Sequence, residues 1–219
     1  MAQHGTRKIT NQGRRNRVVG KFMSAKMKRA IWWESQFERD YCYILEHDRD
    51  VIAYRSQPIT ISYSFENCVY KHTPDFEIIR HSLVLPQYAE IKPDDNAIKE
   101  DFIRLHRARC AFFHERGNEY ILCTGSHLRE GHRLRNIKLL YRYARASLDP
   151  VLLNRLRDII PANSRLSMLE FAERCGTQGA DICFCYALIY HGEITIDLDS
   201  PIQPDMQVTT TWSAQESLP

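Results

Sequence analysis

Two short motifs contain acidic and basic residues, and each motif lies in a segment that is predicted to form a β-strand. A TPDF motif (residues 73–76) lies inside one strand-like run, and a YAEIK motif (residues 88–92) ends another. Because strand side chains alternate between faces, Glu90 and Lys92 point the same way, and the residues between them point to an apolar face. If the two strands are neighbours, Asp75 joins this pair at one edge of the sheet.

This trio predicts a site for a divalent cation. Two carboxylates close together repel each other, and a bound cation makes that arrangement tolerable. Mg²⁺ prefers oxygen ligands, so Asp75, Glu90 and the backbone carbonyl of Ile91 suit it, and Mn²⁺ can take its place. Such an ion lowers the pKa of a bound water and stabilises the charge that develops when a phosphodiester is hydrolysed. Lys92 would add electrostatic stabilisation as an ammonium group, rather than act as a base.

Glu38 adds a carboxylate from a helix predicted over residues 34–46. Phe37, Tyr41 and Leu45 lie on the apolar stripe of that helix, and Glu38 would lie over the same sheet edge. A second source of carboxylates allows one or two ions per site. A solvated helical glutamate is the alternative for Glu38, and a lone ExK pattern is common on edge strands. The order Glu, then Pro-Asp, then Glu-x-Lys is more specific than any of its parts.

The predicted elements give an α/β fold, with a mixed sheet flanked by helices. After the first helix, strand-like runs cover residues 51–54, 59–65, 69–79 and 84–92. A long helix follows over residues 97–115, then a buried strand over 120–123 and a helix over 128–146. The hairpin strands should be antiparallel, whereas the late strand should run parallel to its neighbour after a crossover helix.

A second, smaller unit is predicted to begin near residue 149. Helical segments cover residues 151–159, 167–174 and 180–190, and a short strand covers 193–198. Ser167, with Glu170 three residues on, is a capping-box pattern. Three short helices with a β element favour a small, mostly helical, winged-helix-like module. The predicted organisation is a basic arm at 1–29, a catalytic domain at 30–147, the small module at 148–200 and a flexible tail at 201–219.

The motifs resemble those of the TnsA endonuclease subunit of heteromeric transposases, a branch of the PD-(D/E)xK nucleases. The resemblance covers about residues 17–125 and rests on KMKR (26–29), ESQFERD (34–40), DVIAYRSQP (50–58), TPDF (73–76) and EIKP (90–93). It implies a restriction-endonuclease-like fold and a metal-dependent DNA endonuclease. Carried over by position, Glu38, Asp75 and Lys92 are catalytic. Glu90 fills a metal-side position that can be Gln in other members.

The same resemblance implies partners and a biological setting. The subunit would cut the 5′ strands at transposon ends during cut-and-paste transposition. A TnsB-type transposase would cut and join the 3′ ends, and a TnsC-type AAA+ ATPase would regulate both. The modest length and compact C-terminal part are compatible with the CRISPR-associated branch of these transposons.

Basic side chains give a further expectation, contact with DNA phosphates. The segment from Arg7 to Arg29 carries basic residues and no acidic one, a distribution that releases counterions on binding nucleic acid. A solvated tail is the alternative for the residues before Arg17. The predicted DNA contacts are Lys26, Lys28, Arg29, Gln57, Lys99 and Arg104. The alternatives are a turn-capping role for Gln57 and a solvated helix face for Lys99 and Arg104.

Composition sets the remaining limits. The chain has 219 residues, 43% hydrophobic and 26% charged, with a formal net charge of +3, the balance of a globular protein. No signal-peptide pattern and no apolar stretch of membrane-spanning length are evident, so we expect a cytoplasmic bacterial protein with reduced cysteines. Cys110 with His114, and Cys123 with His127, have the spacing of zinc ligands, but their apolar neighbours favour core packing.

Other functions stay open at this point. A stand-alone repair or restriction nuclease would share the fold, although the chain offers no obvious module for reading a target sequence. A non-catalytic DNA-binding adaptor would be expected to have lost an acidic ligand, and every predicted acidic ligand is present in the sequence. A zinc-binding interaction module would rest on the Cys and His spacing.

Overall fold

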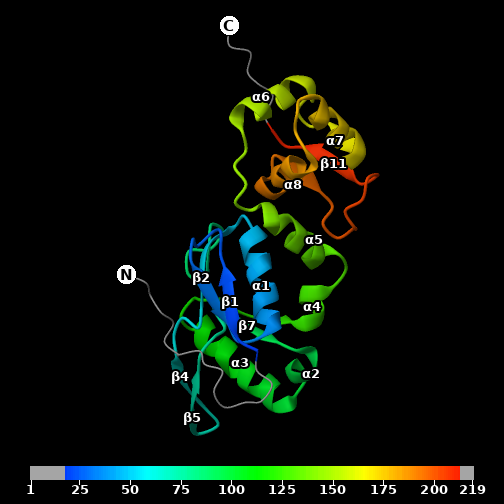
Figure 1. The fold of residues 1–219 in the computed structure, drawn as a ribbon. Helices are drawn as coiled ribbons and strands as arrows, with labels where there is room; N and C mark the ends of the chain where they lie inside the picture. The colour runs from blue at the N-terminus through cyan, green and yellow to red at the C-terminus, as the bar shows by residue number, and fades with distance from the viewer. Residues whose placement is uncertain (1–17, 213–219) are drawn as a thin grey trace. The chain divides into compact units, whose positions relative to one another are not determined.

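The chain divides into two compact units, residues 1–130 and residues 131–219, whose elements are labelled in Figure 1. The computed structural model describes residues 18–212. In this part of the chain, no helix is long and apolar enough to cross a membrane. The first unit contains one four-stranded and two two-stranded sheets, and the second unit contains a three-stranded sheet, within the described residues.

The first unit is built on a mixed sheet with the strand order β3-β6-β7-β8. Its strands are β3 (Val51–Ser56), β6 (Phe76–Arg80), β7 (Gln87–Lys92) and β8 (Tyr120–Thr124), and its helices are α1 (Gln36–His47), α2 (Asp94–Ala97), α3 (Glu100–His114) and α4 (Gly125–Arg129). β3, β6 and β7 pair antiparallel, and β8 runs parallel to β7. The predicted α/β class and the parallel late strand are therefore confirmed.

Helices cover both faces of this sheet. α1 packs on the face that holds Phe76, and the Tyr41 ring of α1 lies 5.4 Å from the Phe76 ring. α3 packs on the opposite face, where the Phe113 ring lies 4.5 Å from the Tyr88 ring of β7. Since side chains alternate along a strand, Glu90, two residues beyond Tyr88, also points to the face under α3.

The strand predicted over residues 69–79 is two strands in the structure, β5 (Cys68–His72) and β6. Pro74 lies between them and has no N–H to donate to a ladder, so the strand is interrupted there. β5 pairs instead with β4 (Ile61–Phe65) in a separate hairpin. The interruption leaves Asp75 directly before β6, at the point where the hairpin joins the sheet.

One of the two long predicted helices is interrupted. The helix predicted over residues 97–115 is α3, which begins at Glu100, whereas the one predicted over 128–146 is α4, α5 (Arg133–Leu140) and the short 3₁₀ helix η1 (Tyr141–Tyr143). Gly131 has a φ of 59°, in the left-handed region that favours glycine, and it follows the end of α4. This glycine explains why the apolar periodicity did not continue as one helix.

A hairpin replaces part of the basic arm predicted over residues 1–29. β1 (Gly20–Met23) and β2 (Ala30–Trp33) pair antiparallel, so the arm prediction is wrong for this segment. The apolar side chain of Phe22 is buried, which gives the segment a reason to fold despite its charge. Residues 1–17 of the predicted arm lie outside the described part of the chain.

The carboxylate of Glu46 in α1 fixes the turn of this hairpin. It accepts hydrogen bonds from the backbone N–H groups of Ala25 (3.1 Å) and Lys26 (3.0 Å) and from the Ser24 hydroxyl. The hydroxyl of Tyr54 on β3 donates to the same carboxylate at 2.7 Å. Glu46 therefore ties the hairpin turn to the helix and to the sheet.

Replacing Glu46 with glutamine is expected to destabilise the protein by about 2–3 kcal/mol, because an amide nitrogen would then face buried donors. Urea unfolding of the purified chain measures this change. Glu66→Gln is the matched control, since Glu66 pairs with Arg104 at an exposed position and its loss should cost under about 1 kcal/mol. Equal effects of the two substitutions would contradict the anchoring role of Glu46.

The second unit packs helices against a small sheet. Its further elements are α6 (Pro150–Ile159), β9 (Arg165–Ser167), α7 (Met168–Thr177), α8 (Ile182–His191), β10 (Ile194–Ile196) and β11 (Gln207–Thr210), and its strand order is β10-β11-β9. The predicted capping box is present. The Ser167 hydroxyl accepts from the N–H of Glu170 at 3.2 Å, and the Glu170 carboxylate accepts from the N–H of Ser167 at 2.8 Å.

The tail predicted over residues 201–219 is wrong for residues 207–212. β11 is the central strand of the small sheet, and the indole N–H of Trp212 donates to the carbonyl of Ile160 at 3.1 Å. The Gln and Thr residues that suggested a tail fit a half-buried strand as well, so composition did not discriminate. Residues 213–219 lie outside the described residues.

The boundary between the units falls near residue 131, earlier than the residue 148 expected from the sequence. Leu140 of α5 is fully buried in the core of the second unit, together with Leu156 and Leu188. α5 therefore belongs to the core of the second unit, although the sequence predicted this segment to be part of the catalytic domain at residues 30–147.

Candidate active site

Asp75, Glu90 and Lys92 meet at one edge of the sheet of the first unit. The backbone N–H of Asp75 donates to the carbonyl of Ala89 on β7 at 3.0 Å. The Asp75 carboxylate accepts a hydrogen bond from the N–H of Ile91 at 2.7 Å. Lys92 Nζ lies 2.5 Å from Glu90 Oε1. Backbone contacts between two strands thus bring the motif residues together.

Glu90 is 2% exposed and lies among donors from other elements. Its Oε2 accepts from the hydroxyl of Tyr120 on β8 at 2.8 Å and lies 2.8 Å from Nε2 of His72 on β5. Arg109 on α3 places Nη1 3.8 Å from Glu90 Oε1. Sequence reasoning missed Tyr120, His72 and Arg109, which the fold brings to the motif from three separate elements.

Negative charge is in excess at this edge. Burial and the charges of Glu90 and Glu38 raise the pKa of Asp75 well above its usual value. Burial by itself would raise the pKa of Glu90 too, but the hydrogen bond from His72 and the charge of Lys92 outweigh it and lower that pKa to about 2. Burial opposes the charge of Lys92, yet Asp75 and Glu90 raise its pKa, so an ammonium group faces the carboxylates.

Glu38 approaches the same cluster from the first turn of α1. The N-cap Ser35 accepts a hydrogen bond from the N–H of Glu38 at 3.1 Å, and Glu38 Oε2 accepts one from the N–H of Glu34 at 2.7 Å. Glu38 is 6% exposed, so it is not a solvated helical glutamate. The charge of Glu38 also contributes to the raised pKa of Asp75.

The donor set fits a divalent cation by its chemistry. A cation between Asp75 and Glu90 would relieve the repulsion that raises the pKa of Asp75, and carboxylate oxygens are donors that Mg²⁺ prefers. Among residues 18–212, however, no group of three or more His, Cys, Asp or Glu side chains is arranged to hold a metal ion. In this arrangement the Lys92 ammonium contacts Glu90, so an arriving cation would compete with it. The fit therefore rests on charge and donor type, not on a completed ligand set.

The zinc-like spacing does not assemble a site in the described part of the chain. Cys110 Sγ lies 3.4 Å from Nε2 of His106 on the same helix, and no metal-binding group includes His114 or His127 within residues 18–212. Cys123 is buried, and burial raises the pKa of its thiol to about 11. A neutral, buried thiol of this kind is a packing residue.

Lys26, one of the predicted DNA contacts, has a structural role. Its Nζ donates to the carbonyls of Leu45 (2.8 Å) and Asp48 (2.6 Å) at the C-terminal end of α1. A cation there also interacts favourably with the helix dipole. Lys28 is exposed and Arg29 is half-buried in the adjoining hairpin turn.

The predicted DNA contacts near α3 have partners within the protein. Lys99 Nζ donates to Asn96 Oδ1 at 2.6 Å. Arg104 forms an ion pair with Glu66 at the tip of the β4–β5 hairpin. These pairs are exposed, so a DNA phosphate would compete with them for the cations.

Gln57 lies beside Asp75. Its backbone N–H donates to the carbonyl of Asp75 at 2.9 Å, and its φ of 46° is unusual for a residue other than glycine. The side chain is 4% exposed. Among the residues that the structure describes, none provides a hydrogen-bond partner for Gln57 Oε1. The backbone hydrogen bond of Gln57 fits the turn-capping alternative. A turn-capping role does not explain why its side-chain amide oxygen is buried without a hydrogen-bond partner among the described residues.

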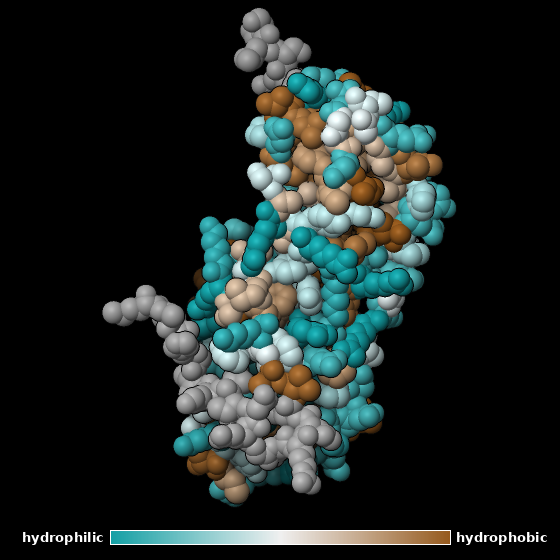
Figure 2. All heavy atoms as spheres, viewed as in Figure 1, coloured by the Kyte–Doolittle hydropathy of each residue, from teal (hydrophilic) through white to brown (hydrophobic). Residues whose placement is uncertain are grey.

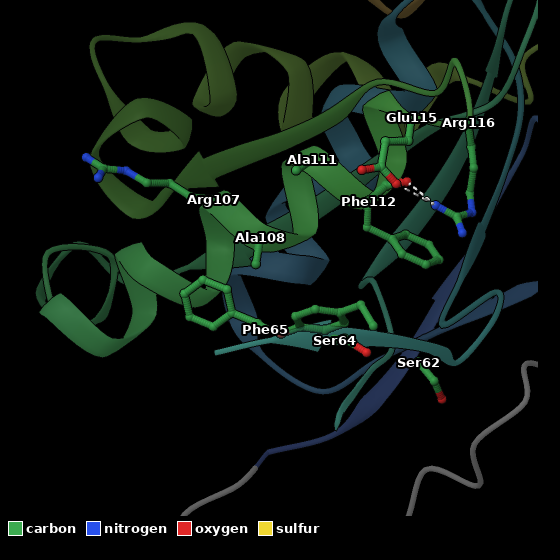
Figure 3. Close-up of a pocket in the computed structure, with 10 residues that line it drawn as sticks. Ser62, Ser64, Phe65, Arg107, Ala108, Ala111, Phe112, Glu115 and Arg116 are labelled. Carbon is green, nitrogen blue, oxygen red and sulfur yellow. Dashed lines mark hydrogen bonds and ion pairs between the residues drawn. The ribbon is translucent and has the colours of Figure 1, made fainter. Parts of the chain in front are cut away.

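A groove of about 590 Å³ lies elsewhere in the first unit, between β4 and α3. Figure 3 shows Ser62 and Ser64 on the strand side and Phe112 on the helix side. The Arg116 guanidinium lies over the Phe112 ring, 3.6 Å from its centroid. The lining residues come from β4, from α3 and from the two residues that follow α3, and none of them belongs to the carboxylate cluster.

A comparison with known protein families finds a match to the part of the chain that contains most of the carboxylate cluster. Residues 48–125 match the family described as TnsA-like endonuclease N terminal. No curated protein matches the chain. The matched segment contains Asp75, Glu90 and Lys92, whereas Glu38 precedes it. Residues 48–125, which lie within the first unit, are therefore similar to the N-terminal domain of TnsA-like endonucleases.

Proposed function

We propose that the chain is a metal-dependent DNA endonuclease, the TnsA-type subunit of a heteromeric transposase, and that it cuts the 5′ strands at transposon ends. The observation that carries this proposal is the meeting of Asp75, Glu90 and Lys92 at a sheet edge inside the matched domain. Glu38 adds a further carboxylate from α1.

The residues have distinct parts in this chemistry. Asp75 and Glu90, with the Ile91 carbonyl, would hold Mg²⁺ or Mn²⁺, and Glu38 would support a first or second ion. When bound, the metal supplies a water of lowered pKa and charge stabilisation at the phosphodiester. The Lys92 ammonium, positioned by Glu90, stabilises the negative charge that develops on the phosphate oxygens.

Partners of the TnsB type and the TnsC type complete the proposal. The second unit exposes apolar side chains of three different helices, Val151, Leu169 and Ile182, and hydrophobic residues show at its surface in Figure 2. Contact with a protein partner would cover such side chains. We assign the recognition of partners or of DNA to this second unit.

Reconstituted transposition tests the proposed function. The purified chain is combined with the TnsB-type transposase, the TnsC-type ATPase and a donor plasmid, with Mg²⁺ or with EDTA. Strand-specific primer extension then maps the breaks at the transposon ends. We expect 5′-strand breaks that require both Mg²⁺ and the chain. Normal 3′ joining without any 5′ break would contradict an endonuclease and favour an adaptor. Cleavage by the chain without its partners would favour a stand-alone nuclease.

Gln57→Met is expected to raise the stability of the metal-free protein by about 1 kcal/mol. It removes, at nearly constant volume, a buried amide oxygen that has no hydrogen-bond partner among the described residues. Cleavage should fall by about tenfold, since Gln57 lies beside Asp75. Urea unfolding and the break-mapping assay measure the two effects.

Gln87→Met is the matched control for this change. Gln87 is also buried, but its amide accepts from Arg80 Nε at 3.0 Å and donates to Glu119 at 2.7 Å. This substitution should therefore lower stability and leave the chemistry of cleavage unchanged. If Gln57→Met also lowers stability and leaves cleavage intact, the glutamine has only a structural role.

A further inference from the structure

Three polar atoms form a tight triangle on one side of Glu90. Tyr120 donates its hydroxyl hydrogen to Glu90 Oε2 at 2.8 Å. His72 Nε2 lies 2.8 Å from the same oxygen and 2.8 Å from the Tyr120 hydroxyl. Tyr120 and His72 both face Oε2, whereas the Lys92 ammonium lies 2.5 Å from the other oxygen, Oε1. The two oxygens of one carboxylate thus have different environments.

The two residues that contact Oε2 are themselves held by strand pairing and by ring contacts. The Tyr120 ring stacks on the Phe113 ring of α3, with 4.9 Å between centroids, and β8 is paired in register along β7. His72 ends the β4–β5 hairpin, directly across from Ile61. Its ring meets the edge of the Tyr120 ring at 6.1 Å.

We propose that His72 and Tyr120 are positioning residues, which fix Oε2 of Glu90 so that Oε1 faces Lys92 and the divalent cation of the active site. This inference rests on the proposed function, because it assigns a role toward the same cation. Groups that orient a ligand carboxylate typically contribute about 10-fold to 100-fold to metal affinity or activity. Without them, Glu90 can rotate and offer both oxygens to Lys92, which would then exclude the cation more effectively.

Tyr120→Phe removes one hydroxyl and keeps the ring that packs on Phe113. A matched control exists in the same unit, because the buried hydroxyl of Tyr54 also donates to a buried glutamate, Glu46, at 2.7 Å. Tyr54→Phe therefore deletes the same kind of bond away from the carboxylate cluster. Both variants should lose similar thermal stability, so a difference in metal binding between them reports on position and not on folding.

The experiment is a calorimetric titration of Mn²⁺ into the full chain without DNA. We expect the Mn²⁺ affinity of Tyr120→Phe to fall about tenfold or more, and that of Tyr54→Phe to stay at the wild-type value. His72→Phe should also weaken binding. His72→Gln keeps an N–H donor near the position of Nε2 and should recover most of the affinity.

The outcomes separate this inference from the function on which it rests. If wild type binds Mn²⁺ and Asp75→Asn does not, but Tyr120→Phe and His72→Phe bind like wild type, the positioning role is wrong and the proposed function stands. If Tyr54→Phe weakens binding as much as Tyr120→Phe, the effect is one of folding and the positioning role is again overturned. If wild type binds no Mn²⁺ at this site, both the inference and the proposed metal dependence fail.

Discussion

Asp75→Asn is expected to abolish DNA cleavage, with a loss of about a thousandfold or more. Asparagine keeps the size of the side chain and an oxygen to accept the hydrogen bond from the N–H of Ile91. It removes the charge that, with Glu90, would attract the proposed divalent cation. Break mapping in the reconstituted reaction measures the loss, and 3′ joining by the transposase, which should persist, is the internal control.

The same substitution should stabilise the metal-free protein. Burial, Glu90 and Glu38 raise the pKa of Asp75, so the ionised carboxylate costs folding free energy at neutral pH. When a carboxyl group has a higher pKa in the folded than in the unfolded state, the protein becomes less stable as the pH rises through the folded-state pKa. Asparagine does not ionise, so the variant avoids this loss of stability. We expect a gain in stability at neutral pH that vanishes below about pH 3.9, where the carboxyl group is protonated in the folded and the unfolded state.

Urea unfolding in EDTA at neutral and acidic pH measures this gain. An inactive variant that is also less stable at neutral pH would indicate a damaged fold. A variant that cuts like wild type would show that Asp75 has no part in catalysis. The combination of greater stability and lost cleavage is what a functional carboxylate in an unfavourable environment predicts.

Lys92→Met is the second substitution with a large expected effect. Cleavage should fall by about a hundredfold to a thousandfold, because the charge developing on the phosphate loses an ammonium group. In contrast to Asp75→Asn, this change should destabilise the metal-free protein by about 2 kcal/mol. It leaves the buried Glu90 without the cation that lies 2.5 Å from Oε1.

A divalent cation should compensate for this loss of stability. Thermal unfolding of Lys92→Met with and without Mn²⁺ measures the compensation, and we expect a larger Mn²⁺-dependent increase in Tm than for wild type. The reason is that the ammonium no longer competes for Glu90. If Mn²⁺ does not stabilise the Lys92→Met variant, the ammonium group of Lys92 and the cation do not compete for Glu90.

The geometry of the site was predictable where strand periodicity fixes the direction of a side chain. The two-residue spacing of Glu90 and Lys92 put both on one face, and the structure places their charged atoms 2.5 Å apart. Asp75 could be placed at the same edge because its motif and theirs lie on successive strands. The fold class followed from the order of elements, including the parallel β8.

The residues that surround Glu90 could not be predicted in the same way. His72 reaches it because Pro74 interrupts the strand and β5 pairs with β4 instead, an arrangement that local periodicity does not encode. Tyr120 reaches it through the register of β8 on β7, which depends on long-range pairing. A tyrosine in an apolar strand run is a weak signal for a buried hydrogen bond, and it is the signal that was available.

Charge was a poor guide at the N-terminus. Lys26 belongs to a basic run, and its ammonium caps α1 because the carbonyls of Leu45 and Asp48 lie in reach. Composition reports the charge of a segment and not the partner that the fold gives it. Trp212 shows the same limit at the other end, where a polar sequence contains a buried indole.

We propose that Asp75 and Glu90 belong to a metal-dependent nuclease site. The most direct measurement is the position of Mn²⁺ in crystals of the chain, located by its anomalous scattering. We predict a peak in contact with the Asp75 carboxylate and Glu90 Oε1, absent from Asp75→Asn crystals. If crystals contain Mn²⁺ at a concentration that supports cleavage in solution and show no peak at this position, Asp75 and Glu90 do not form the metal site.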